Sequence, residues 1–319
     1  MTRELLIFRH GKSDWSAGVD DYRRPLKDRG KRGAQRIGVW LAQQNIQPEL
    51  VVTSPAERAL VTAQKACKAM GGGDQGIHKD KRIYAAGLDE LIEVLGDCSQ
   101  DAGRVMLVGH NPGLEELLVW LVSDALPVPD DGKLLPTATL ARLQMPTDWR
   151  ELKAGCARLD SITRPGTLPK KFPYPGPDGK ELRDRPAYYY TQSSVIPYRL
   201  RDGKPEILVI ASSKKHHLVV PKGIKDPGLS PRESAAKEAL EEAGVEGEIA
   251  ETALGSYTCE KWGATCTVAV YPMKVTRVIA EDAWEERHRG REWVTPDMAA
   301  SRLKQEELRP LVRKLEAML

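Results

Sequence analysis

The sequence lacks CxxC pairs, long hydrophobic runs and a strong excess of charge of either sign. Its five cysteines are odd in number and widely spaced, so we expect reduced, structural thiols and neither zinc sites nor redox centres. No apolar run approaches membrane-spanning length, and the N-terminus enters an apolar stretch without a signal region, which predicts a cytoplasmic protein with no membrane partner. A net charge of +3 over 48 basic and 45 acidic residues gives no reason to expect a nucleic-acid partner.

At 319 residues, with 41% hydrophobic content, the chain is long enough for two domains that each bury a core. In the first part, apolar strands alternate with amphipathic helices, which predicts an α/β domain with a mainly parallel sheet flanked by helices. The expected strands are 4–8, 50–53, 105–108 and 137–144, and the expected helices are 32–44, 57–70, 88–95 and 113–121.

The pattern changes after a stretch rich in Pro, Gly and Lys at 163–180, which is typical of a linker. The Asp202-Gly203 turn signal joins two expected strands and predicts a hairpin. The expected strands are 193–198, 207–211 and 266–275, and the expected helices are 234–243 and 305–318, which indicates an α+β domain. We therefore predict a first domain at 1–165, a linker at 166–187 and a second domain at 188–319.

Two histidines follow expected strands of the first domain. His10 comes directly after the first strand and adjoins Arg9, while His110 follows the strand at 105–108. Arg58 lies at a third strand-to-helix junction. Because open α/β sheets bind ligands at the carboxyl ends of their strands, these side chains are expected to form one phosphate pocket. There an imidazole can attack phosphorus, while guanidinium groups and the second imidazole stabilise the phosphoryl oxygens.

The motifs RHGKSDW and VGHNPGLE around these histidines resemble the histidine phosphatase superfamily, closest to its small SixA-type phosphohistidine phosphatases, over roughly 1–165. The resemblance implies that His10 is the nucleophile, that Arg9, Arg58 and His110 clamp the phosphate, and that a phosphohistidine protein is one candidate partner. No motif assigns the acid that protonates the leaving group in larger members. Asp89 and Glu90 are the nearest candidates, but they fit better the acidic first turn of a helix.

Three carboxylates gather on one expected helix of the second domain. Glu238 and Glu242 are four positions apart and Glu241 is three from Glu238, so all project to one face. Clustered carboxylates repel one another unless a cation neutralises them, and oxygen-only ligands suit Mg²⁺ or Mn²⁺. The pattern therefore predicts a metal site for phosphoanhydride cleavage, with Glu241 and Glu242 also in the catalytic set.

The segment from Gly223 to Val245 resembles the Nudix box, Gly-x5-Glu-x7-Arg-Glu-U-x-Glu-Glu-x-Gly-U with U aliphatic, without a gap. The resemblance implies a Nudix fold, a mixed sheet sandwiched by helices. Two positions depart from the box. Leu229 replaces its first glutamate, and Lys237 replaces its arginine, which loses a bidentate fork but keeps the charge.

The stretch 281–294 makes the second domain resemble the diphosphoinositol polyphosphate phosphohydrolases, over about 188–316. Glu285 or Glu286 is a candidate for a further carboxylate, with Glu286 assigned to the metal. A cluster of basic residues is expected to surround a highly phosphorylated substrate by charge-assisted hydrogen bonds. The cluster consists of Lys214, Lys215, His216, His217, Lys222, Arg287, Arg289 and Arg291, of which Lys215, Lys222, Arg287, Arg289 and Arg291 are the assigned contacts.

We therefore expect a bifunctional phosphohydrolase of small phosphorylated substrates. The second domain would use Mg²⁺ or Mn²⁺ to cleave inositol pyrophosphates, diadenosine polyphosphates or related compounds, and the first would act through His10. Two alternatives stay open. In the first, the second domain would be a ligand sensor without turnover, as the departures at Leu229 and Lys237 would allow. In the second, it would hydrolyse nucleoside triphosphates. The oligomeric state, and whether the two sites act in sequence, are left open.

Overall fold

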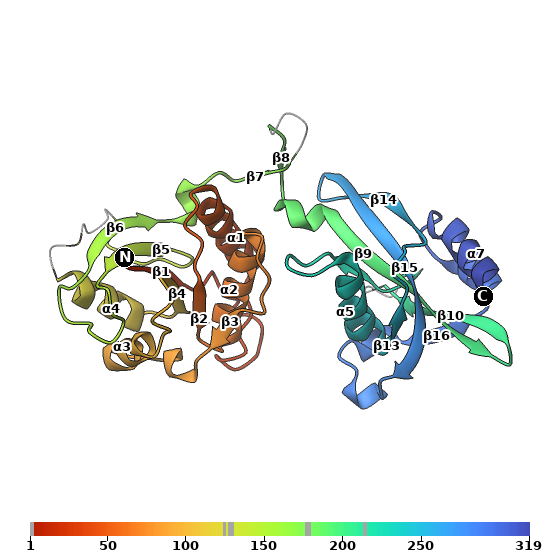
Figure 1. Cartoon of the computed structure of the whole chain (residues 1–319), viewed down its shortest axis with the longest axis horizontal. Coiled ribbons are helices and arrows are strands. Elements are labelled where there is room, and N and C mark those ends of the chain that lie inside the picture. Colours follow the sequence, from red (N-terminus) through yellow and green to blue (C-terminus); the bar gives the residue numbers. More distant parts are fainter. Residues whose placement is uncertain (1–2, 124–125, 127–130, 176–179, 213–215) are drawn as a thin grey trace. The chain divides into compact units, whose positions relative to one another are not determined.

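The computed structural model describes residues 3–123, 126, 131–175, 180–212 and 216–319. The chain divides into two compact units, Met1–Phe172 and Pro173–Leu319, and each has its own sheet and core (Figure 1). The boundary between the units falls inside the expected linker, and the second unit begins with short elements. They are the small sheet of β7 (Phe172–Pro173) and β8 (Leu182–Arg183), and the 3₁₀ helix Ala187–Tyr190, most of which lies beyond the expected linker. None of the helices in the described ranges has the length and apolar character of a membrane span.

The first unit contains a six-stranded sheet in the order β3-β2-β4-β1-β5-β6. The first four strands along the chain are parallel where they pair, and the last two run antiparallel. They are β1 (Arg3–Arg9), β2 (Leu50–Thr53), β3 (Ile77–Lys79), β4 (Arg104–Gly109), β5 (Leu140–Met145) and β6 (Arg158–Thr163). The predicted α/β fold with a mainly parallel sheet is confirmed.

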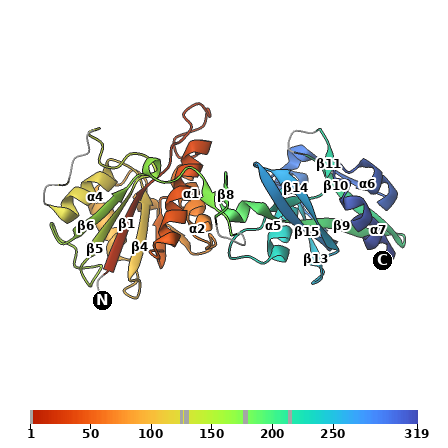
Figure 2. The ribbon, with the colours of Figure 1, turned by 90° about the horizontal axis from the view of Figure 1, so that it is seen from above.

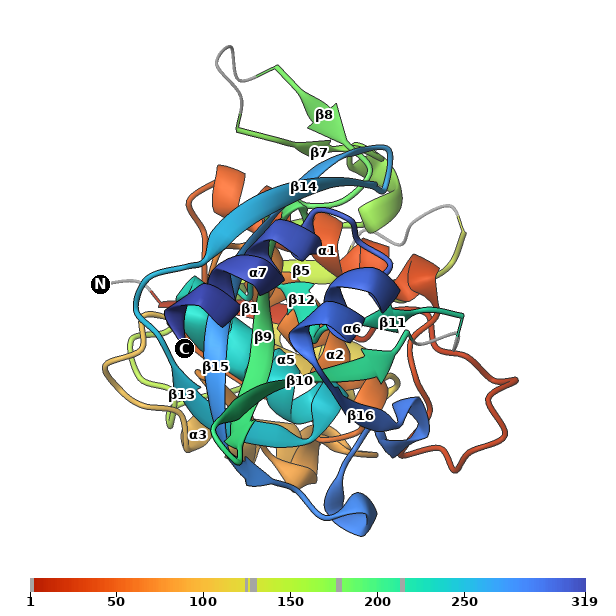
Figure 3. The ribbon, with the colours of Figure 1, turned by 90° about the vertical axis from the view of Figure 1, so that its right-hand side faces the viewer.

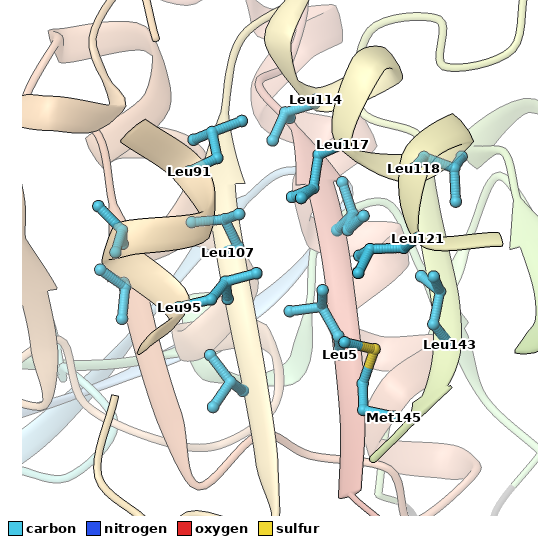
Figure 4. Packing of buried hydrophobic residues seen from close by; sticks show 14 of the residues in the cluster. Leu5, Leu91, Leu95, Leu107, Leu114, Leu117, Leu118, Leu121, Leu143 and Met145 are labelled. Atoms are coloured by element: carbon cyan, nitrogen blue, oxygen red, sulfur yellow. The ribbon is translucent and has the colours of Figure 1, made fainter. Parts of the chain in front are cut away.

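Helices cover both faces of this sheet (Figure 2). They are α1 (Asp28–Gln43), α2 (Glu57–Ala69), α3 (Leu88–Gly96) and α4 (Gly113–Val122), with the 3₁₀ helix η1 (Lys81–Ile83) before α3. Because side chains alternate along a strand, Leu6 and Phe8 of β1 pack toward α1 and α2, whereas Leu5 packs toward α3 and α4 (Figure 4). This double burial explains why β1 is a continuous apolar run.

The second unit is built around an eight-stranded mixed sheet, in which β9 and β15 pair parallel and the other pairs are antiparallel. Its strands are β9 (Thr191–Arg201), β10 (Lys204–Ala211), β11 (Leu218–Val219), β12 (Lys222–Ile224), β13 (Val245–Ile249), β14 (Gly255–Lys261), β15 (Ala264–Val278) and β16 (Arg291–Val294). Helix α5 (Pro231–Ala243) packs on one face, and α6 (Pro296–Arg302) and α7 (Leu308–Met318) pack on the other (Figure 3). The expected α+β sandwich is confirmed.

Several elements were not predicted from the sequence pattern, or begin at other residues than predicted. Strands β3, β6, β13, β14 and β16 are short or have many exposed positions, so they show no apolar run. Helix α1 begins at Asp28, one turn before the prediction, because its first turn contains no apolar residue. The terminal helix begins at Leu308 and not at Gln305.

Candidate active sites

The first site forms where β1 and β4 end side by side. Arg9 pairs in register with Gly109, so the next residues, His10 and His110, meet at the carboxyl edge of the sheet. Their ring centroids are 5.1 Å apart, and only 8% of the His10 surface is exposed. The structure thus brings together the two histidines that the sequence pairs.

The protonation state of His10 follows from its neighbour. Its Nδ1 lies 2.7 Å from the carbonyl oxygen of Gly11, and a carbonyl can only accept, so Nδ1 carries the proton. Burial, together with the charges of Arg58 and Arg9, lowers the pKa of His10 to about 4, so the ring is neutral near pH 7. The lone pair of a neutral imidazole with this tautomer is on Nε2, which is therefore the nucleophilic atom.

His110 is held by the strand-to-helix junction after β2. Its Nε2 lies 2.9 Å from Oγ of Ser54, and its buried Nδ1 has no hydrogen-bond partner among the described residues. Burial and the charges of His10 and Arg58 lower the pKa of His110 to about 3. A buried polar atom without a partner is costly, so Nδ1 marks a position where a ligand is expected to bind.

Three arginines share one pattern of contacts around the histidines. Arg9 donates from Nη1 to the Leu135 carbonyl (2.6 Å), and Arg58 donates from its Nη atoms to the Asp21 carbonyl (2.5 Å) and carboxylate (2.8 Å). Arg24 donates to Ser13 Oγ (2.9 Å) and to the Asp21 carboxylate (2.7 Å). The buried Nε of each has no partner among the described residues. With His110 Nδ1, these unpaired polar atoms suit an oxyanion.

Arg24, Asp21 and Tyr84 were missed by the sequence motifs. Arg24 and Asp21 lie in the loop between β1 and α1, and the Tyr84 hydroxyl donates to the Asp21 carboxylate at 3.0 Å. The Tyr84 ring lies edge-on to His110, with centroids 5.8 Å apart. The DYRRP sequence at 21–25 contains two arginines not far along the chain from the motif histidine, but nothing in their spacing shows that the loop folds back.

The acid candidates Asp89 and Glu90 lie in the first turn of α3, as their alternative interpretation predicts. The Glu90 carboxylate accepts from the backbone N–H of Gly87 at 3.0 Å and so caps the helix, and Asp89 is exposed in the same turn. Both positions are those of an acidic first turn of a helix.

The second site is built on α5, which Ser230 and Glu233 begin with a reciprocal capping box. Burial and the charges of Glu242 and Glu241 raise the pKa of Glu238 to about 8. Its carboxylate fills the space beside Gly223, where a Cβ would lie 1.8 Å from Oε1. The glycine that begins the box is therefore required for the position of this carboxylate.

The other two carboxylates have cationic neighbours. Glu242 accepts from the Lys222 backbone N–H at 3.0 Å and from Arg289 Nη2 at 2.6 Å, and Arg289 also donates to Glu286. Glu241 lies 4.0 Å from Nζ of Lys237, which forms a 2.7 Å ion pair with Asp226. No three His, Cys, Asp or Glu side chains in the described parts lie close enough to hold a metal ion. The donor set nevertheless fits Mg²⁺ or Mn²⁺ by chemistry, because its carboxylates repel one another.

A cavity of about 380 Å³ opens beside Glu242. Val219, Val220, Tyr257 and Leu308 line its apolar part. Its basic side chains are His216, His217, Lys222, Lys261, Arg289 and Lys304, of which Lys261 and Lys304 were not predicted. Burial lowers the pKa of Lys222, whose Nζ lies 5.8 Å from the centre of the Tyr257 ring. The cavity thus places several positive charges next to Glu242.

Two of the expected substrate contacts do not line this cavity, and a third lies outside the described residues. Arg291 donates to the carbonyls of Ala243 (3.3 Å), Gly244 (3.1 Å) and Ile279 (2.6 Å), so it caps the C-terminus of α5. The described contacts of its guanidinium group are those of a helix cap. Arg287 is exposed and does not line the cavity, and Lys215, with Lys214, lies outside the described residues.

The lowered pKa values of His10 and His110 predict acid sensitivity of the first unit. The unfolded chain, with a histidine pKa near 6.5, binds more protons than the folded chain between pH 6.5 and about 4. The contribution of His10 and His110 to the free energy of unfolding therefore falls as the pH is lowered through this window, and it levels off below about pH 3, where His110 is also protonated in the folded chain. In urea unfolding, His10→Gln should reduce this dependence, whereas exposed His78→Gln should follow the wild type. Identical pH dependence in all three proteins would contradict the assignment.

The contact at Gly223 predicts a selective effect on metal binding. The methyl group of Gly223→Ala displaces the Glu238 carboxylate, so Mn²⁺ affinity measured by electron paramagnetic resonance should fall by about 10-fold or more. Gly166→Ala, whose Cβ meets nothing within 4 Å, is the matched control. Unchanged Mn²⁺ binding in Gly223→Ala would show that Glu238 is not a ligand.

Comparisons with known proteins match each of the two units to a protein family. The model of the histidine phosphatase superfamily (branch 1) matches residues 5–85, and that of the NUDIX domain matches residues 191–315. An uncharacterized Mycobacterium tuberculosis protein is 31% identical over 155 residues, 47% of this chain and 95% of that protein. Arabidopsis thaliana Nudix hydrolase 12, mitochondrial, is 33% identical over 137 residues, 35% of this chain and 67% of that protein. The structure of the protein histidine phosphatase SixA complexed with tungstate, 19% identical, covers 51% of this chain and 97% of its own, with a TM-score of 0.44.

Proposed function

Because the chain joins a domain of the histidine phosphatase superfamily to a Nudix hydrolase domain, two hydrolase families, we propose that it is a bifunctional phosphohydrolase with one site in each unit. The first site would transfer a phosphoryl group through His10, and the second would cleave a phosphoanhydride with a divalent metal ion. The observation that carries the proposal is the neutral His10 tautomer beside the unpaired side-chain nitrogens of Arg9, Arg58 and His110 in the described residues.

In the first site, the Nε2 lone pair of His10 attacks phosphorus. The Nε2–P bond forms while the bond to the leaving group breaks, and Arg9, Arg58 and His110 stabilise the equatorial oxygens. Water then attacks the phosphohistidine, which releases phosphate and restores His10. Since no carboxylic acid has been assigned to protonate the leaving group, the favoured substrate is one whose leaving group needs little protonation, such as a phosphohistidine of the SixA type.

In the second site, Glu238, Glu241 and Glu242 would hold Mg²⁺ or Mn²⁺, with Glu286 next to Glu242 through Arg289. A metal ion held there would lower the pKa of water and neutralise phosphate oxygens. Gly223 leaves room for Glu238, and the Lys222 backbone N–H fixes one oxygen of Glu242. These contacts orient the carboxylates along α5 before the substrate binds.

The cavity beside Glu242 supports a substrate with several phosphates. Its lysines, Arg289 and histidines can pair with many oxyanions, whereas Tyr257 is buried, with 6% of its surface exposed, and offers no open ring to a nucleobase. We therefore place inositol pyrophosphates, diadenosine polyphosphates and related polyphosphates ahead of ordinary nucleoside triphosphates. Charge density, more than base identity, would determine the choice.

A phosphoenzyme should be detectable on His10. Rapid acid-free quench after mixing with labelled phosphohistidine peptide should trap acid-labile phosphate on the wild type and none on His10→Ala. His78→Ala, at an exposed position of the same unit, should label like the wild type. Intact phosphatase turnover in His10→Ala would overturn the assignment.

Removal of a single carboxylate should strongly reduce the rate of phosphoanhydride cleavage. Glu238→Gln and Glu242→Gln should lower kcat for diadenosine tetraphosphate or an inositol pyrophosphate by about 100-fold or more, because each loses a charge at the metal site. Exposed Glu251→Gln is the matched control. If the wild type binds these compounds tightly in saturating Mg²⁺ but never turns them over, the second unit is a ligand sensor.

A further inference from the structure

The loop between β1 and α1 folds back onto the phosphatase site. Its base is fixed by the Ser13–Leu26 bridge and by the Asp14 N–H, which donates to the Pro25 carbonyl at 2.8 Å. Its tip is tied to α2, because the Glu57 N–H donates to the Tyr22 carbonyl at 3.0 Å. The exposed Asp21 and the buried Arg24 are therefore held in a defined place although the loop has no regular structure.

Arg24 is held on three sides. Its Nη1 donates to Ser13, its Nη2 donates to Asp21, and its guanidinium carbon lies 3.5 Å from the centre of the Trp15 ring. Only 7% of its surface is exposed, yet its buried Nε has no partner among the described residues. Its charge also acts to lower the pKa of His10 and of His110.

Asp21 joins Arg24 to Arg58. One carboxylate oxygen accepts from Arg24 Nη2 (2.7 Å), and the other accepts from Arg58 Nη2 (2.8 Å) and from the Tyr84 hydroxyl (3.0 Å). Although burial acts to raise it, the Tyr84 hydrogen bond and the two arginine charges hold the pKa of Asp21 below its usual range. Asp21 is therefore an anion, which fits a counter-ion and not a proton donor.

We propose that Arg24 is a further guanidinium contact of the phosphoryl group, and that Asp21 is a positioning residue that holds the Nη ends of Arg24 and Arg58. This arrangement leaves the Nε–H of each arginine for the phosphoryl oxygens, as in Arg9, whose Nη1 is likewise bound by protein. The inference rests on the proposed phosphatase function of the same site. It adds a loop to a site otherwise formed by strand ends.

Orthovanadate binding to the full chain tests the proposal without turnover. Asp21→Asn keeps the shape of the side chain but loses the charge, and Arg24→Lys keeps the charge but loses Nε. Each should raise the Kd for vanadate, measured by calorimetry, by about 10-fold or more, since charge-assisted hydrogen bonds are lost. The double variant should bind no more weakly than the weaker single variant, because both changes disable the same contact.

Asp20→Asn is the matched control, since Asp20 bonds to the exposed Arg23 in the same loop. This variant should bind vanadate like the wild type. If Asp21→Asn fails to fold, Tyr84→Phe serves in its place. It removes one hydrogen bond to Asp21 and should raise the Kd for vanadate by about 3-fold or more. Unchanged or tighter binding in Asp21→Asn would overturn the positioning role, as would additive losses in the double variant. Wild-type vanadate binding without phosphoenzyme on His10 would instead refute the proposed function alone.

Discussion

Both candidate sites depend on the repulsion between like charges that the fold holds close together. In the first unit the charges are the guanidinium groups of Arg9, Arg24 and Arg58, and in the second they are the carboxylates of α5. Such clusters are unfavourable until a ligand of opposite charge binds. Each unit tolerates its cluster because single counter-ions offset part of the repulsion, Asp21 in the first and Arg289 in the second.

The two sites differ in how the backbone imposes the clustering. In the first unit, parallel pairing of β1 with β4 fixes His10 beside His110, and each arginine comes from a separate segment. In the second unit, one helix supplies all three carboxylates through its periodicity, and Gly223 on β12 leaves the space that Glu238 needs. The first arrangement depends on tertiary structure, whereas the second is largely encoded in a single stretch of sequence.

This difference explains how much the sequence could predict. Apolar strands and helical spacing can be read from the sequence, so the two folds could be predicted from it. The same patterns pointed to His10 and His110 after strands and to the carboxylates on one face of α5. Asp21 and Arg24 could not, because an irregular loop has no period to show where its side chains return. Arg291 was assigned to substrate because composition cannot distinguish an arginine that caps a helix from one that lines a cavity. Lys261 and Lys304 reach that cavity only through tertiary folding.

The central claim is that one chain contains two phosphohydrolase sites with opposite charge requirements. The first site surrounds His10 with arginines, and its one described carboxylate, Asp21, is already paired with two of them, whereas the α5 site gathers three carboxylates. The most direct test measures both activities of the wild-type chain before and after chelation with excess EDTA. The account predicts that hydrolysis of diadenosine tetraphosphate or an inositol pyrophosphate falls to background and returns with Mg²⁺, while phosphohistidine hydrolysis is unchanged. Loss of both activities, or retention of both, would contradict it.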